Sequence, residues 1–414
     1  MGAVAEELVT ERKWMPGILH EFDVGLMTAC RDRHYAFGLA MALISEGVHV
    51  EFVGGDEIDS PELHTTPSLR FLNFRRKLSS NPGEKLWQLV LYYARIIRYV
   101  ARPNPKILHI LWNNKLELFD RTILMPYYKM LGKKIALTAH NVNTARRDSS
   151  DSWLNRATLG FQYRLCDHIF VHTEKMKREL IQDFAVRAEN VTVIPYGINN
   201  AVPHTELTAS EAKRRLGVQE REKTILFFGN IGPYKGLDHL IAAFQILIAR
   251  NGEYRLVIAG KQRTGAEQYM KDIREATAQE VRRGRIIQRI EHIPDAEIES
   301  YFMAADVVVL PYTSIFQSGI LFLGQSFGLP VIATDVGSLR EDIIENETGF
   351  LCKPSDPADL ARAIETYFES DLFKDLNNRR QKIREHACER HSWNVVGEMT
   401  RKVYAELLRR NDSG

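Results

Sequence analysis

Short apolar runs alternate with longer amphipathic stretches along this sequence, and the alternation starts again near the middle of the chain. The first series of apolar runs comprises residues 22–30, 48–54, 106–112, 133–141 and 168–173. The second series comprises residues 223–229, 254–260, 285–293, 306–312 and 329–335. Strands that are apolar on both faces need helices on both sides, so the pattern predicts parallel sheets in an α/β fold.

A chain of 414 residues is too long for one compact core, so two domains are expected. Residues 191–210 lie between the two series and are rich in Pro, Gly, Asn and Thr, which is typical of a linker. We therefore predict two Rossmann-like domains that face a central cleft.

Composition and charge argue against several classes of protein. The 55 basic and 53 acidic side chains leave a net charge of +2, which gives no support to a nucleic-acid partner. Four scattered cysteines without a C-x-x-C pair argue against a zinc site and against a disulfide scaffold. Residues 1–17 lack the apolar core of a secretory signal, and we find no run of roughly 18 apolar residues to span a membrane. We expect a cytoplasmic protein, soluble or peripheral at the inner face of a membrane.

Residues 68–102 combine basic and aromatic side chains. The basic residues are Arg70, Arg75, Arg76, Lys77, Arg95, Arg98 and Arg102, and the aromatic residues are Phe71, Phe74, Trp87, Tyr92, Tyr93 and Tyr99. Such an amphipathic surface suits an anionic membrane interface. The alternative is a packed helix with a solvated basic edge, because aromatic residues at helical spacing usually belong to a core.

The stretch FFGNIGPYKGL, residues 227–237, interrupts an apolar strand with a glycine turn and leads into a helix. Such a turn aims backbone N–H groups at a ligand above the sheet edge. Gly229 and Gly232 permit close approach, and Lys235 adds a point charge suited to phosphate. A solvent-facing lysine is the alternative. The spacing is not that of a P-loop, since no Ser or Thr follows the lysine to hold magnesium.

Two further turns follow the strands at 306–312 and 329–335. A helix is expected to begin near Ser318, so the backbone N–H groups of Ser318, Gly319 and Ile320 point outward, ready for a diphosphate. Residues 334–338, TDVGS, form a third turn at the carboxyl edge, where doubly wound sheets bind ligands. Three such turns in one half of the chain predict a phosphate site.

The run from ILFFGNIGPYKGLDHLIAAF through IEHIPDAEIESYFMAADVVVLPY to FGLPVIATDVGSLREDIIENETGFLCKPSDPADLARAI resembles the donor half of the retaining glycosyltransferases of family 4, which have the GT-B fold. The resemblance is strong over residues 190–395, and ALTAHNV and CDHIFVHTEKMKREL match the N-terminal half in style. It implies an N-terminal acceptor domain (1–200), a C-terminal donor domain (201–395), and a last segment (396–414) that packs back on the first domain.

The resemblance also implies roles for individual residues. Lys235 pairs with the donor diphosphate, Gly229 lies beneath the nucleotide phosphates, and the amides of Ser318, Gly319 and Ile320 bind the distal phosphate. The backbone of Ile293 meets the nucleobase, and His140 contacts the donor sugar.

The chain departs from the family pattern at several positions. Ile315 and Leu323 replace two glutamates, and Asn230 and Gly232 stand where a basic residue is usual. Gln317, with Ser318, is the expected polar substitute in the second turn. Glu341 after the third turn has two readings, contact with a sugar hydroxyl or compensation of a helix dipole. The segment ACRDRHYAFG (29–38) replaces a glycine-rich loop.

Together these patterns predict a hexosyltransferase that takes a sugar from a nucleotide-diphospho-sugar, such as a UDP- or GDP-sugar, and transfers it with retention. The expected acceptor is a saccharide or a lipid-linked saccharide, and neither a cofactor nor a metal is expected. Two alternatives remain. One is a catalytically degenerate scaffold subunit, which the apolar Ile315 and Leu323 favour, and the other is a nucleotide-sugar epimerase or hydrolase.

Overall fold

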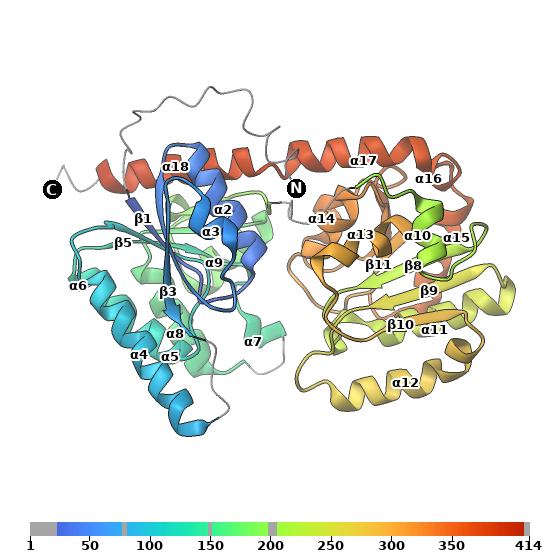
Figure 1. Ribbon diagram of the computed structural model, residues 1–414, viewed down its shortest axis with the longest axis horizontal. Coiled ribbons are helices and arrows are strands. Elements are labelled where there is room, and N and C mark those ends of the chain that lie inside the picture. The colour runs from blue at the N-terminus through green and yellow to red at the C-terminus, as the bar shows by residue number, and fades with distance from the viewer. Residues whose placement is uncertain (1–22, 77–80, 148–150, 198–204, 410–414) are drawn as a thin grey trace.

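The structure is a computed structural model that describes residues 23–76, 81–147, 151–197 and 205–409 (Figure 1). It contains two parallel sheets, one in each half of the chain, with helices packed around each. The predicted α/β GT-B architecture is confirmed. The predicted domain boundary at residues 200 and 201 lies outside the described residues.

The N-terminal sheet has the order β3-β2-β1-β4-β5-β6-β7. Its strands are β1 (Asp23–Met27), β2 (His49–Gly55), β3 (Leu69–Arg75), β4 (Ile107–Ile110), β5 (Lys134–Thr138), β6 (His168–Val171) and β7 (Val191–Val193). The helical elements of this half are α2 (Arg33–Ser45), α3 (Pro61–Thr65), α4 (Pro82–Val100), α5 (Glu117–Phe119), η1 (Asp120–Leu124), α6 (Met125–Met130), α7 (Thr144–Arg147), α8 (Trp153–Leu165), α9 (Glu174–Phe184) and η2 (Ala188–Asn190).

The C-terminal sheet has the order β10-β9-β8-β11-β12-β13. Its strands are β8 (Lys223–Phe228), β9 (Tyr254–Ala259), β10 (Ile286–Arg289), β11 (Val307–Leu310), β12 (Val331–Thr334) and β13 (Gly349–Cys352). Its helical elements are α10 (Ala209–Arg215), η3 (Pro233–Lys235), α11 (Leu237–Arg250), α12 (Glu267–Arg282), α13 (Asp295–Ala304), α14 (Gly319–Ser326), η4 (Leu339–Asp342), α15 (Pro357–Glu369), α16 (Asp371–Lys374) and α17 (Leu376–Arg390).

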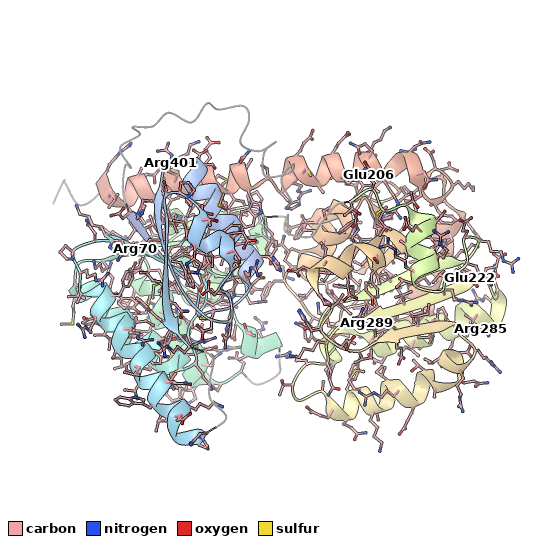
Figure 2. All side chains as sticks on the ribbon, in the orientation of Figure 1. Arg70, Glu206, Glu222, Arg285, Arg289 and Arg401 are labelled. Atoms are coloured by element: carbon pink, nitrogen blue, oxygen red, sulfur yellow. The ribbon has the colours of Figure 1, made fainter. Side chains whose placement is uncertain are left out.

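The last helix, α18 (Trp393–Arg409), crosses back from the C-terminal half and packs on α2 (Figure 1). Gly397 permits the close approach, since a Cβ there would lie 2.5 Å from the carbonyl oxygen of Ala42. Arg401, labelled in Figure 2, pairs with Glu46 at 3.7 Å. The crossing helix is therefore part of the N-terminal core.

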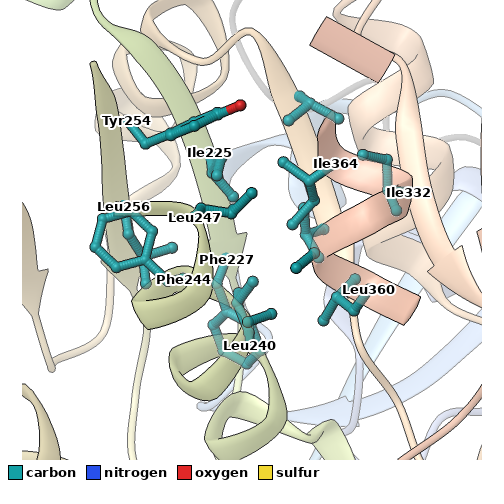
Figure 3. Packing of buried hydrophobic residues seen from close by; sticks show 14 of the residues in the cluster. Ile225, Phe227, Leu240, Phe244, Leu247, Tyr254, Leu256, Ile332, Leu360 and Ile364 are labelled. Atoms are coloured by element: carbon teal, nitrogen blue, oxygen red, sulfur yellow. The ribbon is translucent and has the colours of Figure 1, made fainter. Parts of the chain in front are cut away.

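One hydrophobic core of the C-terminal half lies between its sheet and helices α11 and α15 (Figure 3). The strands contribute the buried side chains of Ile225, Phe227 and Leu256 to this core. The helices contribute those of Leu240, Phe244 and Ile364, which belong to the same buried cluster. Burial of each such side chain stabilises the folded state by about 1.5–3 kcal/mol. The glycine turn at the end of β8 therefore follows a stably packed strand.

Two expectations about segments were incomplete. Residues 191–193 of the predicted linker form the edge strand β7, and residues 69–75 of the basic, aromatic segment form the edge strand β3. Within α4, Tyr92, Tyr93 and Tyr99 are buried in the N-terminal core, whereas Trp87 is exposed. The three tyrosines therefore belong to a packed helix, as the alternative to a membrane surface predicted. Of the described residues, none lies in a helix long and apolar enough to cross a membrane.

Candidate active site

The first glycine turn meets the start of α14. Gly229 follows β8 with φ +107°, and a Cβ at this position would lie 3.3 Å from Cγ1 of Ile320. Gly229 and Ile320 are 91 residues apart in sequence but share one site because β8 and β11 are neighbours in the sheet. The two phosphate-binding turns expected from the sequence therefore lie side by side.

Lys235 is buried, with 7% of its surface exposed, so the solvent-facing alternative does not apply. Its Nζ lies 3.9 Å from the centre of the Tyr312 ring, which is a cation–π contact. The Tyr312 hydroxyl in turn lies 3.1 Å from Oγ of Ser318. One tyrosine ring thus connects the lysine of the first turn with the serine of the second.

The second turn places the start of α14 beside Tyr196 of the N-terminal half. Ser318 is the N-cap residue and makes no side-chain capping hydrogen bond. Gly319 is exposed, and Tyr196 of the N-terminal half lies 3.6 Å, through its hydroxyl, from the position of a Cβ on this glycine. A helix start without a side-chain cap, next to the other half of the molecule, is a favourable place for an anion.

The third turn packs against the second one. Gly337 has φ +62°, and a Cβ there would lie 1.8 Å from the Ile315 carbonyl oxygen. The backbone N–H of Ser338 donates to the Phe316 carbonyl at 2.9 Å. The predicted convergence of three turns at the carboxyl edge of this sheet is thus present in the fold.

Asp342, rather than Glu341, is the acidic group that faces the second turn. Glu341 is exposed, whereas Asp342 is buried and accepts a hydrogen bond from Gln317 at 3.2 Å. Burial raises the pKa of the Asp342 carboxyl to about 6. Among the described residues, Oε1 of Gln317 is buried without a hydrogen-bond partner. Asp342 was missed by the sequence analysis.

A second cation also lies at the first turn. Asn230 is exposed and Gly232 is buried, and the side chain of Arg263 lies 3.5 Å from the position of a Cβ on Gly232. A β-bridge between Ile231 and Gln262 brings the turn after β9 to this place. The position of Arg263 after a neighbouring strand is the sequence signal that could have identified it.

Ile315, Leu323 and Ile293 belong to the apolar packing of the C-terminal half. Leu323 and Ile293 are buried and Ile315 is half-buried, all in or against the same cluster. Leu323 therefore fills core space where the family pattern has a glutamate. Asp295, close to Ile293, lies 3.3 Å from Nε2 of His34 in the N-terminal half.

His140 lies at the end of β5 within a group of aromatic rings. It stacks on Trp112 with 4.5 Å between ring centres and meets Tyr35 edge-on at 4.6 Å. His172, whose Nε2 lies 3.2 Å from Nδ1 of His140, contacts the Ile194 carbonyl through its own Nδ1 at 3.3 Å.

The Ile194 carbonyl determines how both histidines carry their protons. A carbonyl only accepts, so Nδ1 of His172 donates and its Nε2 accepts from Nδ1–H of His140. Nε2 of His140 then carries a lone pair; this atom is buried and has no hydrogen-bond partner among the described residues. Burial lowers the pKa of His172 to about 4, and burial followed by the charge of His172 holds the pKa of His140 well below its ordinary value.

The two halves meet at these turns. Phe316 of the second turn packs against the N-terminal core, and Lys175 of α9 donates to the Gly337 carbonyl at 3.5 Å. A cavity of about 450 Å³ lies in the N-terminal half next to His140, with Trp112 and Thr138 among its lining residues. The turns of the C-terminal sheet thus contact the N-terminal half, which holds this cavity.

Comparison with known proteins agrees with this arrangement. The family model described as Glycosyl transferases group 1 matches residues 209–390, and the one described as Glycosyltransferase Family 4 matches residues 33–202. The chain belongs to the family 4 (group 1) glycosyltransferases.

Curated relatives match the chain at moderate identity. A D-inositol 3-phosphate glycosyltransferase of Corynebacterium aurimucosum is 27% identical over 249 residues, which is 58% of this chain and 57% of that protein. An uncharacterized glycosyltransferase of Methanocaldococcus jannaschii is 28% identical over 58% of this chain and 60% of its own length. The matched region spans less than two thirds of the length of these relatives.

Solved structures share the fold. Sucrose-phosphate synthase from Thermosynechococcus elongatus superposes with a TM-score of 0.75 at 18% identity and covers 94% of this chain and 100% of its own. Anabaena HepE in complex with UDP-glucose superposes with a TM-score of 0.72 at 16% identity, with 93% and 99% covered.

Proposed function

We propose that this protein is a glycosyltransferase that moves a sugar from a nucleotide-diphospho-sugar to a hydroxyl-bearing acceptor with retention of configuration. The observation that carries the proposal is the meeting of Lys235, Tyr312 and Ser318 beside Gly229 at the carboxyl edge of the C-terminal sheet. The buried Lys235 and an open helix start suit a diphosphate. The UDP-glucose complex of Anabaena HepE supports a uridine donor.

In the proposed reaction the acceptor oxygen bonds to the anomeric carbon on the face from which the diphosphate oxygen departs. The electron pair of the broken carbon–oxygen bond stays on the diphosphate, and the acceptor hydroxyl proton passes to a diphosphate oxygen. Lys235 and the N–H groups at the start of α14 lie where they can stabilise the growing negative charge. The same groups supply positive charge without a divalent metal.

His140 is proposed to hold the donor sugar. The lone pair on its Nε2 can accept a hydrogen bond from a sugar hydroxyl, because the contact with His172 occupies its other nitrogen. A neutral imidazole is required for this role, and burial keeps the pKa of His140 low.

The acceptor is proposed to be a saccharide or a lipid-linked saccharide, with the protein held at the inner face of a membrane. Leu86, Trp87 and Val90 of α4 are exposed, and Lys85 and Arg98 of the same helix are also exposed. Co-sedimentation with phosphatidylcholine vesicles, with and without phosphatidylglycerol, tests this placement. Binding that requires phosphatidylglycerol is expected, and binding indifferent to lipid charge contradicts the electrostatic part.

The donor site is tested by Lys235→Ala, with Lys271→Ala on the exposed face of α12 as the matched control. We expect Lys235→Ala to lower kcat by about 100-fold, the usual effect of removing one group that stabilises transition-state charge. It should also reduce the thermal stabilisation by UDP-glucose, whereas Lys271→Ala changes neither value. Near-normal turnover of Lys235→Ala would show that the phosphate role is wrong.

The buried Leu323 also favours a second candidate, a catalytically degenerate binding or scaffold subunit. Thermal shift assays against UDP-, GDP- and ADP-sugars separate the two candidates, since a scaffold that has lost its donor site responds to none of them. Product formation from the donor alone, without an acceptor, would instead indicate an epimerase or a hydrolase.

A further inference from the structure

A cavity of about 470 Å³ lies at the amino edge of the N-terminal sheet, and its volume is typical of small-molecule sites. Among its lining residues, Lys134 begins β5, and Asp167 and Asn190 immediately precede β6 and β7. His140 instead follows the carboxyl end of β5, a strand of five residues that spans roughly 16 Å. We call this cavity the amino-edge cavity. It lies at the opposite edge of the sheet from the candidate active site.

The charged side chains of the amino-edge cavity are mostly basic. The lining residues include Lys129, Lys134, Arg164 and Arg187, with Asp167 as the one acid among them. Both carboxylate oxygens of Asp167 accept from Nζ of Lys129 at 2.8 Å, and Oδ2 also accepts from the backbone N–H of Ile135. Lys129 and Asp167 therefore balance each other, and the other basic side chains leave a surplus of positive charge.

Lys134, Arg164 and Arg187 carry this surplus. Their side chains make no ion pair and no hydrogen bond with any described residue. Lys134 is half-buried, and the two arginines are exposed. Like charges that share a cavity repel one another and concentrate a positive field there, so the arrangement favours an anionic ligand.

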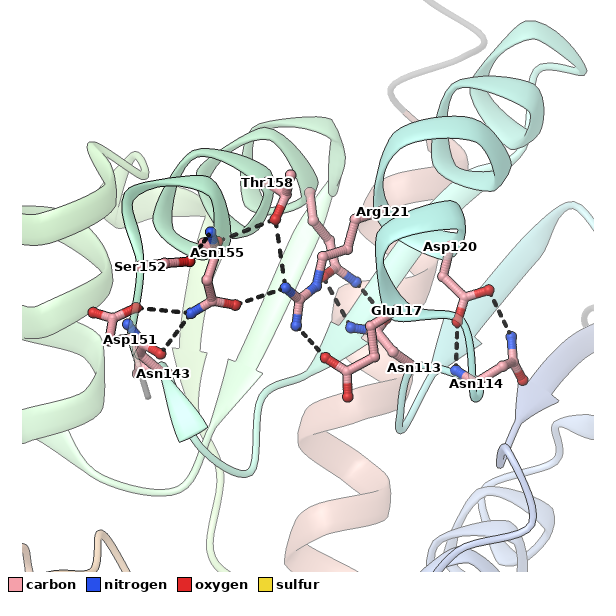
Figure 4. A network of polar contacts seen from close by, with 12 residues as sticks. Asn113, Asn114, Glu117, Asp120, Arg121, Asn143, Asp151, Ser152, Asn155 and Thr158 are labelled. Carbon is pink, nitrogen blue, oxygen red and sulfur yellow. Dashed lines mark hydrogen bonds and ion pairs between the residues drawn. The ribbon is translucent and has the colours of Figure 1, made fainter. Parts of the chain in front are cut away.

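Arg121, which lines the cavity next to His140, shows how a structural arginine is held in this half of the molecule (Figure 4). It is buried and donates to Glu117 at 2.5 Å and to Asn155 at 2.9 Å. Asn155 lies in the first turn of α8, and Arg164 lies in the last turn of the same helix. One end of α8 thus supplies a partner to a structural arginine, whereas the other end presents an arginine without one to a cavity.

The helix ends at the amino-edge cavity weaken the positive field only in part. Leu165 ends α8 and Ala185 caps α9, and both residues line the cavity. The carboxyl end of a helix carries about half a negative charge, so two such ends offset roughly one of the three uncompensated cations. The last carbonyl groups of a helix also lack partners within it and can accept hydrogen bonds from hydroxyl groups.

The remaining walls suit the carbon skeleton of a ligand. Asn190 is half-buried, and its side-chain amide makes no hydrogen bond with the described residues. This amide can both donate to a hydroxyl group and accept from one. Val186 and Leu407, the latter from α18, add apolar surface. The cavity therefore combines a cationic region with groups that can hold a small hydroxyl-bearing body.

We propose that the amino-edge cavity binds a phosphate monoester group through Lys134, Arg164 and Arg187, with the body of the ligand against Asn190 and the apolar wall. A phosphate monoester carries between one and two negative charges at neutral pH and presents three strong acceptor oxygens. Arginine binds such a group through two parallel hydrogen bonds. The ligand is bound without a bond being made or broken, and the inference does not depend on the transfer reaction.

Titration calorimetry of the full-length protein with glucose 6-phosphate, inorganic phosphate and glucose tests this inference. We expect glucose 6-phosphate to bind at least tenfold more tightly than glucose. Arg164→Gln and Arg187→Gln should each weaken its binding by roughly tenfold, the effect of losing a hydrogen bond to a charged group. Arg178→Gln, which changes an exposed arginine of α9 outside the cavity, is the matched control and should leave the affinity unchanged. Because all three arginines are exposed, the variants should melt at the parent temperature without ligand.

Lys235→Ala separates the amino-edge cavity from the donor turns. Glucose 6-phosphate should bind this variant with unchanged affinity, and it should bind the parent protein equally well in saturating UDP-glucose. Binding that is lost in Lys235→Ala and kept in Arg164→Gln and Arg187→Gln would place the phosphate at the donor turns and overturn the inference. Near-normal turnover of Lys235→Ala would reject the phosphate role of that lysine and leave the inference in place.

A phosphatidic acid headgroup carries the same phosphate monoester, so the source of the ligand needs its own measurement. Co-sedimentation with phosphatidylcholine vesicles, with and without phosphatidic acid, provides it. Binding to phosphatidic acid that Arg187→Gln weakens, without binding of glucose 6-phosphate, would assign the phosphate to a lipid. Binding of glucose 6-phosphate alone would assign it to a soluble compound. The inference is overturned if no phosphate probe binds, or if glucose binds as tightly as glucose 6-phosphate.

Discussion

His172 acts on the candidate site through its contact with His140. It is not among the residues that line the cavity next to His140, yet its link to the Ile194 carbonyl determines which nitrogen of His140 is left without a partner among the described residues. A backbone carbonyl cannot change its role as acceptor, so the order of donors and acceptors along this chain is determined at its first member. His172 is therefore a positioning residue.

Substitution of His172 separates positioning from packing. His172→Phe keeps an aromatic ring but removes the acceptor for Nδ1–H of His140, so kcat is expected to fall by roughly tenfold, the value of one net hydrogen bond. His172→Gln retains an acceptor oxygen and should recover most of the loss. The measurement is kcat and KM for both variants across pH. Equal rates in the two variants would mean that His172 serves packing alone.

The glycines of the turn between β8 and α11 differ in how much space there is for a side chain. Gly236 has φ +63°, and a Cβ there would lie 1.9 Å from the Pro311 carbonyl oxygen. Gly232 has extended backbone, and its nearest neighbour to such a Cβ is Cδ of Arg263 at 3.5 Å. Only Gly236 is required by the close approach of η3 to the end of β11.

We therefore expect Gly236→Ala to lower the free energy of unfolding by about 2–4 kcal/mol, from strain and a backbone clash together. Gly232→Ala is the control from the same turn and should change this free energy by less than about 1 kcal/mol. Urea denaturation of both variants measures the difference. Similar values for the two glycines would contradict the assigned geometry.

Helix α18 is held to the N-terminal core by a buried polar contact. Nδ1 of His109 lies 2.5 Å from the Tyr404 hydroxyl, and its Nε2 lies 2.7 Å from Oγ1 of Thr138. Tyr404→Phe leaves a buried ring nitrogen without this partner and should cost about 1–3 kcal/mol in urea denaturation.

Tyr127→Phe is the comparison for Tyr404→Phe. The Tyr127 hydroxyl donates to the Ile97 carbonyl, which also accepts from the backbone N–H of Ala101, so its loss leaves no group unpaired. We expect an effect within about 0.5 kcal/mol. A cost for Tyr404→Phe as small as this would show that the contact with His109 does not hold α18 to the core.

For the whole molecule, buried histidines make folding sensitive to acid. Burial lowers the pKa of His109 to about 3, and of His172 and His391 to about 4. The unfolded chain binds protons on these rings as pH falls below about 6.5, whereas the folded chain does not. Their contribution to stability is complete above pH 6.5 and is lost as pH falls towards 4.

Carboxyls whose pKa is raised by burial oppose this trend. Burial raises the pKa of Asp120 and of Asp342 to about 6, so their folded forms take up protons in the same range and gain stability. The pKa shifts of His109, His172 and His391 are larger than those of Asp120 and Asp342. We expect the free energy of unfolding, from urea titrations, to fall by several kcal/mol between pH 6.5 and 4.

A matched pair of variants tests the origin of this loss. His391→Gln removes one buried ring and should flatten the pH dependence, whereas His64→Gln removes an exposed one and should leave it unchanged. If both variants kept the slope of the parent protein, the acid sensitivity would arise elsewhere.

Most central strands could be predicted from the sequence, and the missed ones share one property. β3, β7 and β13 lie at sheet edges, where partial exposure permits polar residues and short runs. Central strands such as β4 and β11 are buried on both faces and read as continuous apolar runs. The apolar signal comes from two-sided burial and is weaker at the sheet edges, where β10 is the one edge strand of the two described sheets that was predicted.

The same division applies to the site. The position of Gly229, Lys235 and Ser318 at one sheet edge could be predicted because a strand, a glycine turn and a helix start are local patterns that one stretch of chain contains. The contact of Lys235 with Tyr312, the approach of Arg263, the buried Asp342 and the link from His172 to His140 join residues from different turns and strands. Such contacts depend on the order of strands in the sheets and on how side chains fill the space between them, which local sequence patterns do not contain.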